Sequence, residues 1–181
     1  MKIIRKWAMS NKNTFTIDPI KKLIRMYMTS GVWLDPFAND NTIKEIGYQN
    51  VITNDLNNSY DTDYHLDANT FLEKFNDVDG VLFDPPYTPR QLKEMYDGIG
   101  QSLTSKDTQL HTWKSWRESI ANCIKPRGIC ISFGYNSNGI GMKRGFKIEF
   151  ILLIAHGSNI NDTICTVERK DDVPVEMGVL R

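Results

Sequence analysis

Residues 81–87, VLFDPPY, join an apolar run to a carboxylate, two prolines and an aromatic ring. The run predicts a buried strand with Asp84 at its carboxyl end. The prolines fix the backbone beside this carboxylate, and neither can donate a hydrogen bond. The stretch is therefore either a rigid turn that only stops a strand, or a small site for a flat ring that carries an amine.

Aspartates also follow three other apolar segments, at Asp35, Asp55 and Asp67. Ligands of open α/β sheets lie at the carboxyl ends of the strands, so we expect these residues and Asp84 to share one edge. Asp55 comes twenty residues after Asp35, a position typical of an acid that binds a ribose diol. Each aspartate alone could cap a helix or close a turn. Together they favour a nucleoside-type ligand with a cationic centre, and they disfavour a phosphate because carboxylates would repel it.

The elements that would position these residues alternate between helices and short apolar strands, which predicts an α/β sheet. Strands are expected in GVWLDPF, NVITNDL, DGVLFDPPY and GICISFGYN, with a stub in YHLDA, and KPRG is expected to turn the chain before GICISFGYN. Helices are expected in TIDPIKKLIRMYM, NTFLEKF and WKSWRESIANCI, and in RQLKEMYDGI after a capping box from Thr88 to Gln91. Asp18 is expected as the N-cap of the first helix, with Pro19 behind it. FKIEFILLIAHG and DTICTVERK predict an antiparallel hairpin.

Length and composition are those of one globular domain, with 181 residues, 40% of them apolar and 24% charged. We expect residues 1–170 to form this domain and residues 171–181 a loose tail. The three cysteines lie far apart, so neither a zinc site nor a disulfide framework is expected. No apolar run approaches the roughly 20 residues of a membrane span. A cytoplasmic protein with no membrane partner is therefore expected.

The zero net charge conceals an uneven distribution of charge along the chain. Residues 1–30 carry seven Lys or Arg and one Asp, whereas residues 31–84 carry two Lys and eleven Asp or Glu. Residues 85–150 are basic again, with ten Lys or Arg and five Asp or Glu. Such blocks either place positive charge on one face beside an acidic pocket or interleave in three dimensions, and both interpretations stay open.

Five segments, in their order along the chain, resemble the motifs of S-adenosylmethionine (AdoMet)-dependent amino-methyltransferases with a DPPY motif. The chain is most similar to small phage- or prophage-type DNA N6-adenine methyltransferases. DPFAND resembles the AdoMet motif after the first strand, NDLN the ribose-binding segment, HLDANTFL the adenine-binding segment and FDPPY the catalytic motif. RKWAMSNKNTFTIDPI is similar to the segment that folds over AdoMet. The resemblance covers about residues 5–170 and implies a Rossmann-like methyltransferase fold, mostly parallel, with a C-terminal antiparallel hairpin.

The resemblance also implies roles for individual residues. Catalysis would fall to Asp84, Pro85, Pro86 and Tyr87: the Asp84 carboxylate and the Pro85 carbonyl would hold the amine, and a flipped base would stack on Tyr87. Cofactor contacts are implied at Trp7, Phe15, Ile17, Asp35, Pro36, Phe37, Ala38, Asp55, Leu56, Asp67 and Ala68. Candidates for nucleic-acid contacts, which could equally be ordinary surface residues, are Arg90, Lys93, Asn136, Lys143 and Arg144. No metal site is expected, and His65, His111 and His156 are expected to face solvent or to be hydrogen-bonded.

The chain departs from the family pattern DPFxGxG, in which the backbone passes close to the cofactor. Its residues there are Ala38, Asn39, Asp40 and Asn41, and the helix before the second strand must be brief or absent. The leading hypothesis is a DNA adenine-N6 methyltransferase. An RNA base-amine methyltransferase (adenine N6 or guanine N2) and a non-catalytic nucleic-acid-binding module remain alternatives. Because no insert is large enough for a target-recognition domain, a homodimer or partner subunit could be required to grip DNA.

Overall fold

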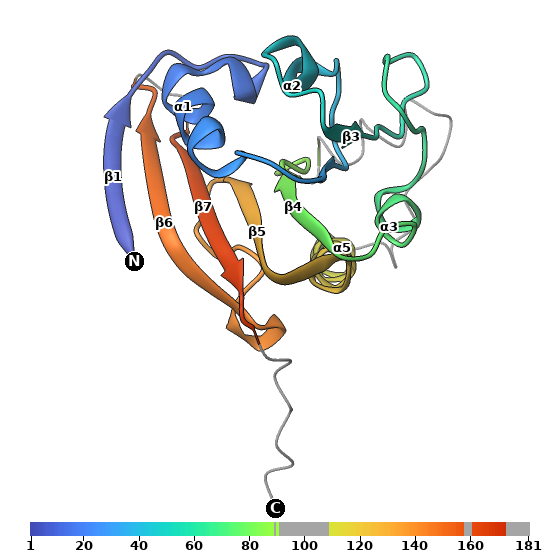
Figure 1. Ribbon diagram of the computed structural model, residues 1–181. Helices are drawn as coiled ribbons and strands as arrows, with labels where there is room; N and C mark the ends of the chain where they lie inside the picture. Colours follow the sequence, from blue (N-terminus) through green and yellow to red (C-terminus); the bar gives the residue numbers. More distant parts are fainter. Residues whose placement is uncertain (89, 91–108, 158–160, 173–181) are drawn as a thin grey trace, which may run out of the picture.

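A seven-stranded sheet forms the centre of the computed structural model, which describes residues 1–88, 90, 109–157 and 161–172 (Figure 1). The strands are β1 (Lys2–Trp7), β2 (Trp33–Asp35), β3 (Val51–Thr53), β4 (Val78–Phe83), β5 (Ile124–Gly134), β6 (Phe146–Ala155) and β7 (Thr163–Lys170). Their order is β1-β6-β7-β5-β4-β2-β3. Only the pairings of β7, with β5 and with β6, are antiparallel. The carboxyl ends of β2, β3, β4 and β5 therefore lie along one edge.

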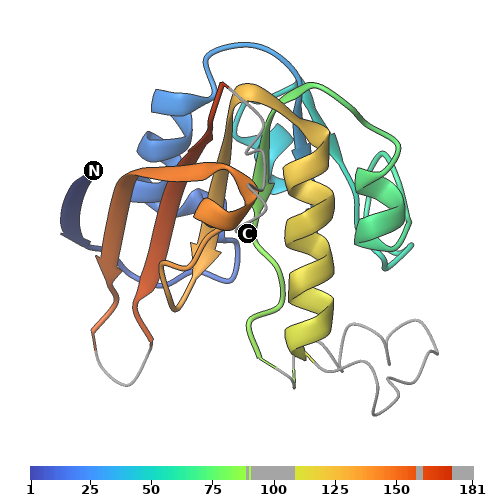
Figure 2. The same ribbon diagram turned by 90° about the horizontal axis from the view of Figure 1, so that it is seen from below.

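Helices cover both faces of this sheet (Figure 2). On one face, α1 (Asp18–Tyr27) buries Ile20, Leu23 and Ile24 in a core with side chains of β5, β6 and β7. On the other face, α3 (Ala68–Leu72) and α5 (Gln109–Cys123) pack in a second core with residues of β4. The remaining helices are short: α2 (Thr42–Glu45) and the 3-10 turns η1 (Thr14–Thr16) and η2 (Met142–Arg144). The sheet is thus sandwiched between two helical layers.

The predicted strands in GVWLDPF, NVITNDL, DGVLFDPPY and GICISFGYN are confirmed, as is the C-terminal hairpin of β6 and β7. The helices in TIDPIKKLIRMYM, NTFLEKF and WKSWRESIANCI are confirmed too, and α2 is brief, as expected. The helix predicted in RQLKEMYDGI lies, apart from Arg90, outside the described residues, as does the tail beyond residue 172. Among the described residues, no helix is long and apolar enough to cross a membrane.

Three local predictions were wrong. The stub strand in YHLDA is reduced to one isolated bridge between Asn54 and Tyr64. Asp18 is the first residue of α1 and not its cap, because Ile17 occupies the N-cap position and no side chain caps the helix. KPRG lies inside β5, where the pairing with β4 shifts register and Arg127 takes a φ of 64°. A bulge absorbs these residues, so the strand continues where a turn was expected.

The edge strand β1 was not predicted either. It pairs in parallel with β6, from Lys2 opposite Phe150 to Trp7 opposite Ala155. It is mostly exposed, so its sequence lacks the alternation that marks a half-buried strand. From β1 the chain must cross the sheet to reach β2 near the opposite edge. Residues 10–17 make part of this crossing over the edge where the aspartates lie.

Candidate active site

A cavity of about 370 Å³ lies at the carboxyl edge of the sheet. Its walls come from segments that are far apart in sequence: residues 10–15 and 17, residues 37–40 and 42, Asp84, Tyr87, Gly134, Tyr135, His156, Asn161 and Thr163. The predicted residues Phe15, Ile17, Phe37, Ala38, Asp84 and Tyr87 are thus brought together. This is the place where an open α/β sheet binds its ligand.

Asp84 follows β4 directly and lies in the wall of this cavity. Its Oδ1 is hidden from solvent and has no hydrogen-bond partner among the described residues. Burial raises the pKa of Asp84 to about 7, against which a hydrogen bond from the Thr14 side chain acts. A buried acceptor without a partner is costly, and a donor on a bound molecule would satisfy it.

Asp35 ends β2 and is completely buried. The Phe37 N–H donates to its Oδ1 over 3.3 Å, while its Oδ2 is buried with no hydrogen-bond partner among the described residues. Burial, and then repulsion from the nearby Asp84, raise the pKa of Asp35 well above its usual range. Burial disfavours the ionised form of both carboxyl groups. A positive charge beside them would stabilise that form and lower both pKa values.

The loop after Asp35 contains the two positions at which the chain departs from the family pattern. Asn39 and Asn41, which stand at the two glycine positions of DPFxGxG, adopt left-handed φ angles of 52° and 61°. Glycine enters this region freely, and asparagine is among the few other residues that tolerate it. The Asn39 N–H also donates to Asp55 Oδ2 over 3.0 Å, which ties the loop to the end of β3. The loop therefore has a left-handed backbone at both positions, each occupied by an asparagine.

A second, very small cavity of about 10 Å³ adjoins Phe37. It unites the other predicted cofactor residues Pro36, Asp55, Leu56, Asp67 and Ala68, together with Trp116. Asp55 and Asp67 also have structural roles, because Asp55 Oδ1 accepts the Asn57 N–H and Asp67 caps α3 through the Asn69 N–H. Both interpretations of these aspartates, as turn and cap residues and as cavity residues, thus fit their positions.

Two tyrosines line the cavity together with Asp84. The rings of Tyr87 and Tyr135 lie 5.1 Å apart between centroids, and a Cβ at Gly134 would come within 3.1 Å of the Tyr87 ring. Sequence reasoning missed Tyr135 and Thr14. Tyr135 could have been found, because it follows a predicted strand as the aspartates do. The contact of Thr14 with Asp84 depends on the chain crossing and has no local signal.

Trp7 does not line the candidate active site, and of the other predicted cofactor contacts it shares a cavity only with Ile17. It is 65% exposed and lines a different cavity, on β1 and α1, beside the first. The reason is its place at the end of an edge strand, where the chain has not yet crossed to the carboxyl ends of β4 and β5. Its role as a cofactor contact stays a prediction.

The candidate nucleic-acid contacts are scattered. Lys143 and Arg144 lie in η2, immediately before β6 and hence at the opposite end of the sheet from the cavity (Figure 1). Arg144 is engaged there, since it pairs with Glu118 over 2.7 Å and donates to the Ile140 carbonyl. Asn136 is exposed and outside the cavity wall, Arg90 is exposed, and Lys93 lies outside the described residues.

His156 is buried and hydrogen-bonded, as predicted: its Nδ1 lies 2.9 Å from the Ala8 carbonyl oxygen and its Nε2 lies 2.8 Å from Thr163 Oγ1. His65 is exposed, and the side chain of His111 is outside the described part of the chain. Within that part, no cluster of three His, Cys, Asp or Glu could hold a metal ion.

No protein-family model matches the chain, and a search of curated proteins finds no relative. Solved structures do resemble it. TrmN from Thermus thermophilus has a TM-score of 0.58 at 15% identity, and the match covers 85% of this chain and 49% of that one. A 1,6-didemethyltoxoflavin-N1-methyltransferase from Burkholderia thailandensis, with bound S-adenosylhomocysteine, has a TM-score of 0.56 at 12% identity, over 85% of this chain and 77% of that one. A candidate rRNA-methylase from Clostridium thermocellum has a TM-score of 0.56 at 11% identity, over 91% and 100%.

These likenesses confirm the Rossmann-like methyltransferase fold expected from the sequence. The chain spans about half the length of TrmN, and the other two structures match over most of their length. At these identities the likeness concerns the fold, and the function must be argued from the site.

Proposed function

We propose that this protein is an AdoMet-dependent methyltransferase that acts on the exocyclic N6 amine of adenine in DNA. The observation that carries the proposal is the buried Oδ1 of Asp84, which lies in the cavity wall with no hydrogen-bond partner among the described residues. Its position at the end of β4, inside the DPPY segment, is where an amine donor would be received.

The residues present fit AdoMet. Phe15, Ile17, Phe37 and Ala38 would contact the cofactor in the main cavity. Asp55 and Asp67 carry acceptors for its ribose and adenine, and the small cavity beside them would have to widen from about 10 Å³ to admit these groups. The carboxyl pair Asp35 and Asp84 suits a cationic ligand, because a positive charge beside them would stabilise the ionised forms that burial disfavours. AdoMet would supply an electrophilic methyl group on its cationic sulfur.

The protein would make the substrate amine reactive by holding it. The lone pair of an exocyclic amine is delocalised into the ring, so the nitrogen is a poor nucleophile. The Asp84 carboxylate would accept one N–H and the Pro85 backbone carbonyl the other, which stabilises the positive charge that develops on nitrogen. Pro85 and Pro86 restrict the backbone, so these acceptors are held in place before the reaction. The Tyr87 ring, backed by Tyr135, would stack on the flipped base.

Two alternatives rest on separate observations. An RNA base-amine methyltransferase is favoured by the similar structure whose name describes an rRNA-methylase. A non-catalytic module had support from the missing glycines of the first motif. The left-handed φ angles of Asn39 and Asn41 weaken that support, since glycine also adopts such angles freely.

The test supplies purified protein with methyl-labelled AdoMet and with unmethylated DNA or RNA in parallel. Label is expected in DNA as N6-methyladenine, and Asp84→Ala is expected to lower the rate at least about a hundredfold. Asp172→Ala, a change at an exposed residue that pairs only loosely with Arg127, is the matched control. Label in RNA alone would replace DNA with RNA as substrate. No label in either, from protein that binds AdoMet, would contradict methyl transfer to nucleic acid.

A further inference from the structure

A larger cavity, of about 730 Å³, lies on β1, α1 and the segment between them, and the proposed reaction does not use it. Its wall includes Lys6, Trp7, Met9, Lys22 and Met26. Trp7, Met9 and Met26 are 65%, 71% and 56% exposed. A tryptophan and two methionines at such exposure form an apolar patch that marks an interaction surface. We call this cavity with its wall the N-terminal groove.

The N-terminal groove continues into the candidate active site. Ser10, Asn11 and Ile17 line both cavities, so the two are neighbours across one short segment. A polymer that places one unit beside Asp84 would therefore have adjacent units within reach of the groove.

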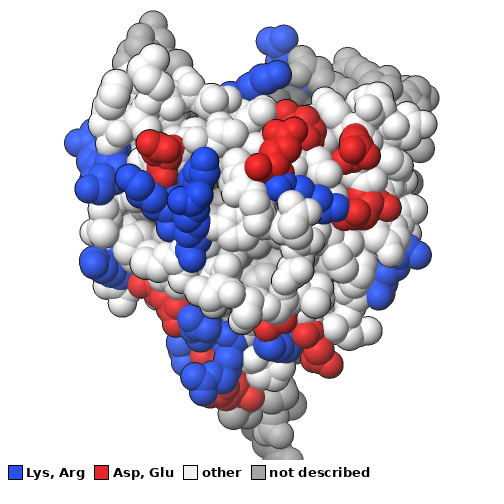
Figure 3. All heavy atoms as spheres, turned by 45° about the horizontal axis from the view of Figure 1, so that its top comes forward, with Lys and Arg blue, Asp and Glu red and all other residues white. Residues whose placement is uncertain are grey.

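The wall of the N-terminal groove carries positive charge. Lys6 and Lys22 are exposed and take part in none of the ion pairs found among the described residues, and Asp18 is the one acid in the wall. Figure 3 shows Lys and Arg gathered over β1 and α1, and Asp and Glu gathered on the other side of the same face, over α2 and β3. The charge blocks of the sequence therefore stay largely separate on this face, with one acidic cluster on the basic side and a basic strip on the acidic side. The basic half suits a polyanion, and the acidic half does not.

We infer that the N-terminal groove binds the single-stranded segment of nucleic acid that flanks the target base. Lys6 and Lys22 contact phosphates, and an unpaired base stacks on Trp7. Cations together with an exposed aromatic ring in one groove are the combination by which proteins hold single strands. The inference rests on the proposed function, since an enzyme that reacts with a nucleobase either takes a single-stranded substrate or flips the base out of its stack.

A second copy of the chain fits this surface less well. The free edge of β1 carries Lys2, Arg5 and Lys6. Two such strands paired edge to edge would bring like charges together, and charged side chains on an edge strand are a common means of preventing this pairing. The same charges attract a phosphate backbone.

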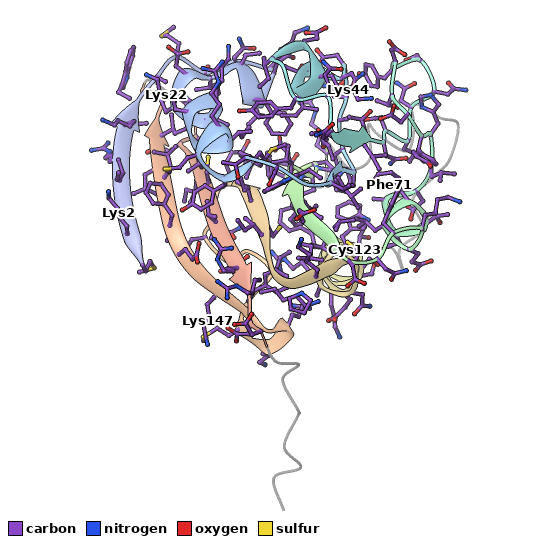
Figure 4. All side chains as sticks on the ribbon, viewed as in Figure 1. Lys2, Lys22, Lys44, Phe71, Cys123 and Lys147 are labelled. Atoms are coloured by element: carbon purple, nitrogen blue, oxygen red, sulfur yellow. The ribbon has the colours of Figure 1, made fainter. Side chains whose placement is uncertain are left out.

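The test measures the binding of fluorescent oligothymidylate and oligouridylate by anisotropy, at several salt concentrations. Thymine and uracil have no exocyclic amine, so the measurement does not depend on methyl transfer. Trp7→Ala should weaken binding roughly tenfold, and Trp7→Phe should retain most of it. Lys6→Ala with Lys22→Ala should weaken binding and lower the slope of log K against log salt by about 1.4. The control is Lys147→Ala, because Lys147 lies at the opposite end of the molecule from Lys22 (Figure 4).

The outcomes separate this inference from the proposed function. If both groove variants bind like the wild type, the inference is overturned, whether or not methyl transfer occurs. If size-exclusion chromatography shows a dimer that the Trp7→Ala change dissociates, the groove is an interface between two copies of the chain. The inference is then equally overturned. Oligonucleotide binding that the groove variants weaken, in a protein that methylates no nucleic acid, would support the groove and contradict the proposed reaction.

Discussion

Asp84 is the residue at which pH should affect stability. Its pKa in the fold is about 7, against an ordinary value of 3.8, because it is buried. Between these values the native state binds more protons than the unfolded state, so the free energy of unfolding falls as pH rises through this window and stays lower above it. The shift corresponds to at most about 4 kcal/mol.

We therefore expect Asp84→Asn to raise the free energy of unfolding at pH 8 by up to about 4 kcal/mol, and to change it little at pH 4, while methyl transfer is lost. Urea denaturation at the two pH values measures the difference. A variant that is destabilised equally at both would show that the carboxylate is not strained in the fold.

The Thr14 side chain should lower the pKa of Asp84. It donates a hydrogen bond to Asp84 and so favours the charged form. The wild-type kcat/KM should rise with pH through about 7, as the carboxylate able to accept the amine N–H forms. Thr14→Val should move this limb to higher pH, and Thr14→Ser should leave it in place. An unmoved limb in Thr14→Val would mean that another group titrates.

The loop after Asp35 can be tested at Asn39. Its φ of 52° costs an alanine about 1–2 kcal/mol but costs glycine no steric strain. Asn39→Gly is thus expected to retain stability and AdoMet affinity, whereas Asn39→Ala should lower the free energy of unfolding by about that amount. Denaturation and AdoMet titration of the two variants check this. Equal behaviour of both would show that the left-handed angle does not matter.

At the scale of elements, the crossing segment between β1 and α1 forms part of the active-site wall. His156 holds its start, because the ring lies between the Ala8 carbonyl and the Thr163 hydroxyl. Two hydrogen bonds worth about 1 kcal/mol each would be lost in His156→Ala. We expect a KM for AdoMet roughly tenfold higher, with a smaller change in kcat.

Steady-state kinetics of His156→Ala provide the measurement, with Asp172→Ala, at an exposed residue outside both cavities, as control. If KM is unchanged while the protein stays folded, the segment does not depend on this anchor.

The elements also show where sequence patterns are sufficient. The helix α1 was predictable because its apolar residues recur at helical spacing, and β4 because its run is continuous. The strand β1 was not, since its exposed residues have no periodicity and its partner β6 lies more than a hundred residues away. The bulge in β5 was read as a turn because Pro126 and Gly128 also occur in turns.

For the whole molecule, cofactor binding should appear as stabilisation. A ligand at a hundred times its Kd adds about 2.7 kcal/mol to the free energy of unfolding. In a domain of this size, that raises Tm by roughly 5–10 °C. S-adenosylhomocysteine or AdoMet should produce such a shift in thermal denaturation, and adenosine triphosphate should not, since carboxylates line the site. A shift with the triphosphate alone would contradict the proposed cofactor.

The sequence by itself determined the α/β class, most strands and helices, and the acidic residues at the strand ends, because periodicity and strand-end position are local properties of the chain. Only the tertiary structure decided that Thr14 reaches Asp84, that Asn39 and Asn41 take left-handed angles, and that Trp7 lies in the N-terminal groove. These features depend on burial, on backbone angles and on contacts between distant segments. They therefore cannot be predicted from residues that are neighbours in the sequence.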